Sequence, residues 1–287
     1  MTRHRRRIAR VFLLCLLSAC FAAQAADWSD TSVAWRAGDR FREPHNPNAI
    51  GKQIASLTHA SGWRYGSQFL NLDLLQSDHR DPASPGGRKG AFEAYLVYRH
   101  TLDIARLGDL HLPGPMRGLG LTAGIDLNAK DDAAYNSRKR MWVLGPQVSW
   151  AVPGRLNTAL LMAWESNAPH GPFPPISGVQ GRYRYKPHPL LAADWSVPVG
   201  EHWAFEGFAN FIASKGRDEA GRATGAETNI DARLMLDAGA LLGARKRAFL
   251  AGIEYQYWHN KFGNTDATTG NRGNTANTPM LRVEHHF

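Results

Sequence analysis

The sequence predicts an all-β fold, a transmembrane antiparallel β-barrel of about 12 strands preceded by a cleaved signal peptide. Three observations support this fold class. Apolar and polar residues alternate with the period of two expected for strands that have one polar and one apolar face. The connections between these stretches alternate between long and short, and no apolar run after residue 25 approaches the about 18 residues of a membrane helix.

The first 25 residues have the pattern of a secretory signal peptide. MTRHRRRIAR carries five arginines, and the apolar run VFLLCLLSACFAA follows it. Ala23-Gln24-Ala25 then has the small-x-small form of a signal peptidase site. Cleavage after Ala25 would leave residues 26–287 as one barrel domain, which we expect to be exported through the periplasm to the bacterial outer membrane.

Both cysteines of the chain, Cys15 and Cys20, lie in this leader. A chain cleaved after Ala25 therefore has neither disulfides nor a thiol nucleophile. An alternative is that Leu17-Ser18-Ala19-Cys20 acts as a lipobox, in which case Cys20 would be lipidated and become the new N-terminus.

The charge of the chain gives no indication of nucleic-acid binding. The whole sequence has 34 basic and 25 acidic residues, but five arginines and no acid lie in the leader. The mature chain keeps 29 basic and 25 acidic residues, a formal charge of about +4. The sequence pI of 9.8 overstates its basic character, and no basic helix or RNP-type motif is present.

Twelve strands are predicted from the alternation, each followed by a turn or loop signal. Their expected ranges are 31–41, 52–60, 65–76, 90–105, 117–128, 139–151, 155–165, 179–197, 202–213, 230–242, 246–260 and 279–287. The pattern is clearest in LGLTAGIDLN, where Leu119 to Leu127 alternate with Thr122, Asp126 and their neighbours. In the eighth strand, Pro187 and Pro189 interrupt the pattern and require a bulge or a bend.

The connections are sorted by length, which indicates a membrane barrel. The odd-numbered connections are polar, and several are long, including QSDHRDPASPGGRKG, SNAPHGPFPPISG, KGRDEAGRATGAETN and FGNTDATTGNRGNTANTP. The even-numbered ones are mostly tight, as in SGWR, VPGR, PVGE and GARK, with LGDLHLPGPMR as the longer exception. Outer-membrane barrels have short periplasmic turns and long outer loops, whereas a soluble β-domain has no reason for this sorting.

The stretch QFLNLDLL shows what the two faces of a strand would contact. Leu70, Leu72 and Leu74 share one face, which meets lipid in a barrel and a protein core in a soluble periplasmic β-domain. Aromatic residues near strand ends favour the barrel because they resemble interfacial girdles. They are Trp35, Trp142, Trp150, Tyr183, Tyr185, Trp195, Trp203, Tyr255 and Tyr257.

The last strand also favours the barrel. The final stretch MLRVEHHF ends on Phe287, with Leu281 and Val283 on the same face. This ending resembles the C-terminal signal by which the barrel assembly machinery recognises outer-membrane proteins, so that machinery is an expected partner.

Several segments resemble the nucleoside-specific channel-forming (Tsx) family of outer-membrane proteins. They are WSDTSVAWRAGDRFREP, THASGWRYGSQFLNLDLLQSD, AFEAYLVYR, WAFEGFANF and EYQYWHN. The resemblance covers nearly the whole mature chain and is one of pattern rather than of short rigid motifs. It implies a monomeric twelve-stranded barrel with a narrow lumen of aromatic and ionisable residues, through which nucleosides diffuse.

Candidate solute contacts are the residues expected on the inward face of the strands. They are Phe69, Asn71, Asp73, Glu93, Tyr95, Arg99, Glu206, Phe208, Asn210, Glu254, Gln256 and Trp258. Aromatic rings stack on bases, and carboxylates and amides bond ribose hydroxyls. Asp231, Arg233 and Asp237 add charges on the tenth strand. Each charge has an alternative structural role in a wall pair, such as Glu93 with Arg99 or Asp231 with Arg233.

Two other functions remain open at this stage. The long loops would suit a surface docking or receptor role without transport. His59-Ala60-Ser61-Gly62 resembles the His-x-Ser-Asn-Gly sequence of outer-membrane lipid hydrolases, but position 62 is Gly and the pair lies near a short turn. We expect no metal and no cofactor, because the histidines are scattered and no phosphate-binding loop is present.

Overall fold

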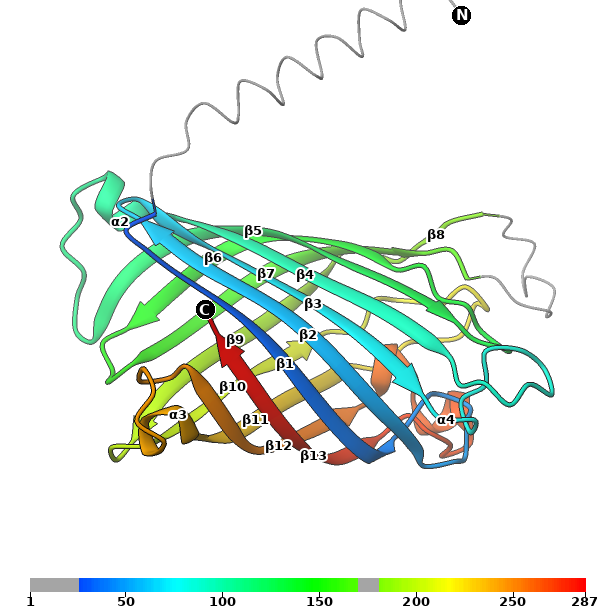
Figure 1. Cartoon of the computed structure of the whole chain (residues 1–287). Coiled ribbons are helices and arrows are strands. Elements are labelled where there is room, and N and C mark those ends of the chain that lie inside the picture. Colours follow the sequence, from blue (N-terminus) through cyan, green and yellow to red (C-terminus); the bar gives the residue numbers. More distant parts are fainter. Residues whose placement is uncertain (1–25, 170–180) are drawn as a thin grey trace, which may run out of the picture.

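The computed structural model describes residues 26–169 and 181–287, so the expected signal peptide with Cys15 and Cys20 lies outside the described residues. The described chain is a single antiparallel sheet that closes on itself into a barrel (Figure 1). Its twelve long strands are β1 Trp28–Phe41, β2 Ile50–Trp63, β3 Gly66–Ser77, β4 Phe92–Asp103, β5 Met116–Asp131, β6 Arg140–Trp150, β7 Arg155–Asn167, β9 His188–Val199, β10 Trp203–Ile212, β11 Glu227–Asp237, β12 Phe249–His259 and β13 Ala276–His286.

The barrel is an up-and-down meander. Each long strand pairs with the long strands before and after it in the sequence, and β1 pairs with β13 to close the ring. In that closing pair Trp35 lies opposite Val283. Closure leaves no unpaired edge among the twelve long strands, which a barrel in a membrane requires because lipid offers no hydrogen-bond partners.

The alternating apolar and polar residues of the strands form an apolar outer wall and a mostly polar lumen. Leu74 is exposed on the outside, whereas the neighbouring Asp73 bonds inward to Ser56 and Arg36. Trp142 and Ile253 are 60% and 61% exposed on the outer wall. Leu70, Leu72 and Leu74 therefore face outward, as predicted, whereas Leu75 packs against apolar residues inside the barrel.

The two ends of the barrel differ as the sequence predicted. The longest loops lie at one end, together with η2 Lys261–Gly263 and α4 Asp266–Thr269, whereas the β4–β5 connection (residues 104–115) is the longer exception at the other end (Figure 1). The opposite end carries the short turns, α2 Ile104–Leu107, α3 Ala238–Leu241, the start of β1 and the end of β13. We call these the long-loop end and the short-turn end.

The eighth predicted strand is divided at its prolines, as expected. The two-residue strand β8 Tyr183–Arg184 pairs with the end of β7, and β9 begins at His188. Three residues separate β8 from β9, but only two residues of β7 lie opposite them, which makes this a β-bulge.

The predicted strand 230–242 is wrong at its end. Its strand stops at Asp237, whose carboxylate accepts hydrogen bonds from the backbone N–H groups of Ala240 (3.0 Å) and Arg247 (2.7 Å). An Asp in this position caps a helix, and the alanines and leucines that follow are strong helix formers.

The outer wall identifies the environment of the barrel. A closed antiparallel barrel with exposed leucines, isoleucines and tryptophans all round is an outer-membrane β-barrel, because water would not tolerate so large an apolar surface. In the described part of the chain, no helix is long and apolar enough to cross a membrane.

Candidate functional site

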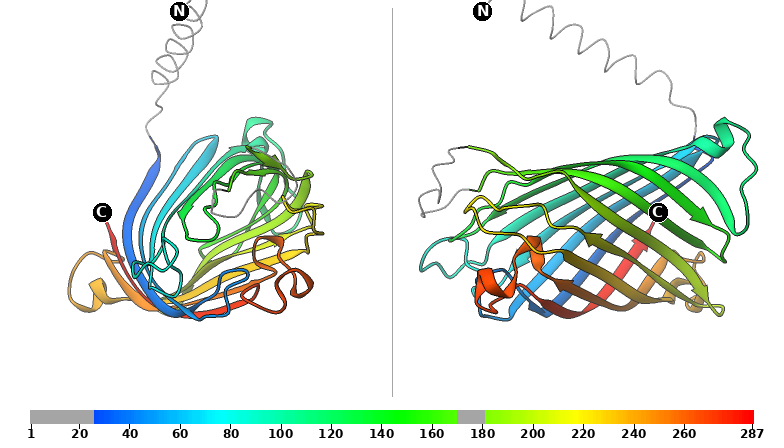
Figure 2. Two further views of the ribbon diagram at one scale, coloured as in Figure 1. Left: turned by 90° about the vertical axis from the view of Figure 1, so that its right-hand side faces the viewer. Right: turned by 180° about the vertical axis from the view of Figure 1, so that it is seen from behind.

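One cavity of the barrel opens at the long-loop end, and we call it the vestibule. It has a volume of about 930 Å³ and lies among the loops that follow β1, β3, β5, β7, β10 and β12. Figure 2 (left) looks into the barrel from this end. Its aromatic lining consists of Tyr135, Tyr183, Tyr185 and Phe262.

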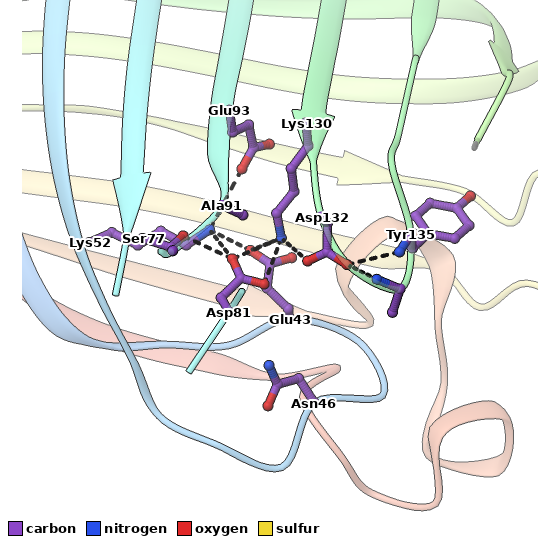
Figure 3. Close-up of polar contacts among 12 residues, drawn as sticks. Glu43, Asn46, Lys52, Ser77, Asp81, Ala91, Glu93, Lys130, Asp132 and Tyr135 are labelled. Atoms are coloured by element: carbon purple, nitrogen blue, oxygen red, sulfur yellow. Dashed lines mark hydrogen bonds and ion pairs between the residues drawn. The ribbon is translucent and has the colours of Figure 1, made fainter. Parts of the chain in front are cut away.

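A set of paired charges, the ion-pair belt, lies beside and below the vestibule. Figure 3 shows six of its members, Glu43, Lys52, Asp81, Glu93, Lys130 and Asp132, and the seventh is Lys261. Lys52 lies 2.5 Å from Glu43, and Lys130 lies 2.9 Å from Asp81. These side chains are only 2% to 13% exposed, so the belt narrows the lumen.

Two loops bring acidic residues into the belt. Glu43 lies two residues after the end of β1, and Asp81 lies in the loop between β3 and β4. The Asp81 carboxylate accepts a hydrogen bond from the Ser77 hydroxyl (2.8 Å), and its carbonyl accepts one from the N–H of Ala91 (2.6 Å). Each loop therefore folds back over the lumen, because its carboxylate neutralises lysines that project from the strands.

The belt perturbs the ionisation of its loop residues. Burial raises the pKa of Glu43, but the ammonium groups of Lys130, Lys261 and Lys52 outweigh this effect and hold the pKa well below its usual value. Burial raises the pKa of Asp81, and Lys130 offsets only part of that rise. Burial also lowers the pKa of Lys261, although Glu43 opposes the shift.

The opposite side of the vestibule floor is built around Glu165. Its carboxylate lies 2.8 Å from the Lys215 ammonium and 3.7 Å from that of Lys139. The Lys215 ammonium also lies 4.6 Å from the centre of the Tyr185 ring. Each of these cations is therefore already neutralised or held on an aromatic face.

The tyrosines above this floor form one connected wall. The rings of Tyr183 and Tyr185 meet edge to face at 5.1 Å between centroids. The hydroxyls of Tyr185 and Tyr135 both donate to Glu219. Burial raises the pKa of Tyr185, so its hydroxyl remains a donor at neutral pH.

This arrangement corrects the predicted role of two aromatic residues. Tyr183 and Tyr185 were expected in the membrane girdle, but they line the vestibule. The physical reason is that the bulge between β8 and β9 sets which way each side chain points beyond the prolines. Trp35, Trp142, Trp203 and Tyr255 are exposed on the outer wall, as a girdle requires.

The inner wall is not polar everywhere. Met141, Val143, Leu161 and Leu190 project inward from β6, β7 and β9 and form a buried apolar cluster with small neighbours. A second cluster of Phe41, Ile50, Ile54 and Met280 packs inside β1, β2 and β13. The long-loop half of the lumen is therefore partly filled with packed side chains.

The twelve predicted site residues lie on the lumen side of their strands, but only Glu93 lines the vestibule. The others lie lower in the barrel. Trp258 is near the belt: its indole N–H donates to Glu227 (2.6 Å), and the Lys261 ammonium lies 4.6 Å from its ring centre. Contact of these twelve residues with a solute stays a prediction.

Most of the lower charged residues form a lattice along the wall. Arg36 of β1 lies 2.5 Å from Asp73 of β3 and 2.6 Å from Glu254 of β12. Arg282 of β13 extends the lattice from Glu254 (2.9 Å) to Glu284 (2.7 Å). This lattice joins strands on both sides of the β1–β13 closure.

The suggested partners within single strands were wrong. Residues 93 and 99 are six positions apart on β4, about 20 Å along a strand, and cannot meet. Arg99 instead pairs with Asp126 on β5 (2.5 Å). Arg233 pairs with Glu206, which lies directly opposite it on β10 (3.1 Å). Neighbouring strands are about 4.8 Å apart, so charges pair across them.

Sequence reasoning missed most of the vestibule. Lys130 and Lys139 lie at the ends of predicted strands, and Tyr135 and Lys215 lie in loops where alternation gives no signal. An available clue was that five of the chain's few lysines, at positions 52, 130, 139, 215 and 261, lie near strand ends at the long-loop end.

The hydrolase pair does not have the geometry of a catalytic site. His59 and Ser61 lie on the outer face near the short-turn end, but each has a different partner. The His59 Nδ1 lies 2.8 Å from the Thr31 hydroxyl, and the Ser61 hydroxyl accepts a hydrogen bond from Gln68 (2.9 Å). Among residues 26–169 and 181–287, no cluster of three or more His, Cys, Asp or Glu residues could hold a metal.

Comparisons with known proteins give similarity in fold only. No family model matches the sequence, and no curated protein does. A NanC porin structure is 9% identical with a TM-score of 0.48, covering 88% of this chain and 98% of that one. The translocator domain of the autotransporter NalP from Neisseria meningitidis is 13% identical with a TM-score of 0.42, covering 99% and 96%. The KdgM porin is 7% identical with a TM-score of 0.41, covering 89% and 99%. The resemblance to the Tsx family stays a prediction.

Proposed function

We propose that this protein is an outer-membrane channel for diffusive passage of small hydrophilic solutes, and that nucleosides are its first candidates. The observation that supports this most is the vestibule, where tyrosines stand above a floor of paired charges. Its volume of about 930 Å³ is within the range of pockets that accept small organic molecules.

The lining suits a solute that has both an aromatic and a hydroxyl-bearing part. Stacking of a base on a tyrosine ring contributes about 1–3 kcal/mol and tolerates any base. The amide of Asn167, the carboxylate of Glu165 and the hydroxyls of the tyrosine wall offer donors and acceptors for a ribose. Several such weak stations favour passage, since a single deep well would retain the solute.

The charges favour an uncharged solute. Each vestibule lysine, Lys130, Lys139 and Lys215, already forms an ion pair with a carboxylate. A phosphate or carboxylate on the solute would have to displace one of these buried partners, which is costly. Nucleosides carry no such group.

The experiment that tests the proposal is single-channel recording of refolded protein in a planar bilayer, titrated with adenosine and thymidine. We expect small current steps, because the ion-pair belt narrows the lumen, and block of these steps by submillimolar nucleoside. The Tyr185→Ala variant should need about 5- to 150-fold more nucleoside for half-block if the ring stacks on the base. Trp142→Ala, on the outer wall, is the matched control and should leave the block unchanged.

Each other result changes the assignment. Steady current that ignores nucleosides would keep the channel and discard the substrate. No current from protein shown to be folded by its heat-dependent gel mobility would remove the channel and leave a surface docking role for the long loops.

A further inference from the structure

A cluster of arginines lies on the outer rim of the barrel, at the long-loop end of β6, β7 and β8. Arg140 on β6 and Arg184 on β8 lie opposite the same residue of β7, Ser166. Residues directly opposite in an antiparallel ladder project from the same face. Trp142 and Trp164 lie on this same face and are exposed on the outer wall, so Arg140 and Arg184 project away from the lumen. Two strand spacings separate these two arginines, a distance of about 10 Å.

Two more guanidinium groups complete this rim cluster. The Arg182 guanidinium donates to the carbonyls of Arg138 (2.8 Å) and Ser166 (3.3 Å) and to the Ser166 hydroxyl (3.3 Å), so it lies between Arg140 and Arg184. Backbone hydrogen bonds continue the β5–β6 ladder beyond the start of β6, through Lys139 and Ser137. The Lys139 side chain points into the lumen, where it pairs with Glu165. Because side chains alternate along a strand, the side chain of Arg138 points outward.

The rim cluster has no acidic counterpart. Arginines such as Arg36, Arg99 and Arg282 pair with carboxylates, but within residues 26–169 and 181–287 no ion pair joins any of these four to a carboxylate. The adjoining sequence 170–180 contains no Asp or Glu. Burial, together with the neighbouring Arg140, lowers the pKa of Arg182, as expected for like charges held together.

The tryptophans next to the rim cluster indicate where the cluster lies relative to the membrane. Trp142 and Trp164 lie opposite each other, one side-chain position below Arg140 and Ser166, and both are exposed on the outer wall. Paired outward tryptophans mark the membrane–water interface of a barrel. The guanidinium groups therefore stand at the level of the lipid headgroups, on the side of the membrane that the long loops face.

We propose that the rim cluster of Arg138, Arg140, Arg182 and Arg184 binds the phosphate of an anionic lipid of the outer leaflet. Guanidinium forks match phosphate oxygens in bidentate geometry. One phosphate above Ser166 would contact the forks of Arg140, Arg182 and Arg184, and the acyl chains would pass down over the two tryptophans. The inference is independent of the solute that the lumen carries.

The test is lipid binding by purified, detergent-solubilised protein, measured by native mass spectrometry. The probes are diphosphoryl lipid A, a neutral diacyl glycolipid without phosphate, and inorganic phosphate. We expect the wild type to retain lipid A, and the Arg140→Gln/Arg184→Gln variant to bind it at least about tenfold more weakly. The Arg140→Lys/Arg184→Lys variant, which keeps the charge but loses the forks, should fall between the two.

The control is Arg117→Gln, which removes an exposed arginine from the short-turn end and should leave lipid A binding unchanged. Equal loss in this control, or equal binding of the neutral glycolipid, would overturn the proposal. Inorganic phosphate that competes as strongly as lipid A would assign the cluster to free phosphate instead. Folding is checked by heat-dependent gel mobility, and Arg184→Gln alone replaces the double variant if that variant misfolds.

Discussion

At the scale of single residues, the lumen is governed by the cost of leaving a charge without a partner. Arg36 illustrates this, because its guanidinium is the shared partner of two carboxylates from strands on either side of β1. Pairs of this kind add little net stability when complete, since both charges lose hydration. Removing one member is far more damaging, because the other stays buried without compensation.

Replacing Arg36 by alanine should therefore destabilise the barrel strongly. Asp73 and Glu254 would lose their common cation, and the expected loss is about 3–5 kcal/mol of unfolding free energy. Urea unfolding of the protein in lipid vesicles measures this. Arg117→Ala is the control at an exposed position, where a change beyond about 0.5 kcal/mol would show that loss of any arginine has this effect.

Phe208 and Phe205 allow an inward and an outward side chain of β10 to be compared. It projects into the lumen, whereas Phe205 on the same strand is exposed to lipid. If Phe208 stacks on the base, Phe208→Ala should raise the nucleoside concentration for half-block about 5- to 150-fold. Phe205→Ala should not change it. An equal effect of both substitutions would indicate general loosening of the wall rather than loss of a stacking contact.

At the scale of elements, strands form where the alternation is clear, and the connections decide what lies at each end. The turn between β6 and β7 is tight because Gly154 adopts a positive φ of +82°. A side chain there would also meet the backbone, since a Cβ would lie 2.2 Å from the carbonyl oxygen of Ser196. The conformation of the long loops depends instead on ion pairs, which hold these loops over the lumen.

Gly154→Ala should destabilise the barrel more than an alanine at Gly114. Gly114 also has a positive φ (+57°), but a Cβ there would have no atom within 4 Å. Both substitutions cost about 1 kcal/mol of backbone strain, and only Gly154→Ala adds a clash with backbone. Equilibrium unfolding of the two variants compares them directly, and equal losses would contradict the role given to Ser196.

Glu43 makes the stability of the long-loop end depend on pH. Its pKa in the folded protein lies well below the usual value, held there by three lysines that outweigh the effect of burial. Its contribution is therefore complete above the usual carboxyl pKa of about 4.3 and is lost as the pH falls from there through the lowered folded value. Glu43→Gln should be less stable than wild type at pH 7, and the difference should vanish under strong acid. Thermal unfolding across pH measures it, and a difference that does not depend on pH would refute the electrostatic account.

At the scale of the whole molecule, closure of the sheet makes the membrane position possible. Pairing of β1 with β13 satisfies the last backbone edge, so the outer wall can be apolar all round. The terminal residue takes part in closure only through its backbone: the N–H of Phe287 donates to the carbonyl of Thr31 (2.9 Å), and its ring is 68% exposed.

Phe287→Ala should therefore impair assembly in cells but not the stability of the refolded barrel. An exposed ring contributes little to folding, so the unfolding free energy should change by less than about 0.5 kcal/mol. If the assembly machinery reads the terminal ring, the amount of barrel in the outer membrane should fall. Phe249→Ala, exposed nearby at the short-turn end, is the control and should not lower that amount. Equal membrane levels of the two variants would remove this role from Phe287.

The sequence alone determined the barrel class, most strands within a few residues and the sorting of the longest loops to one end. These properties depend on local periodicity and on turn residues, and both signals come from residues that are close together in the sequence. It also gave the inward direction of residues such as Asp73 and Glu254, because direction alternates along a strand. Only the tertiary structure decided which charges meet and where the vestibule lies. Partners such as Arg36 with Glu254 and Lys215 with Glu165 are distant in sequence, and strand register and loop folding bring them together.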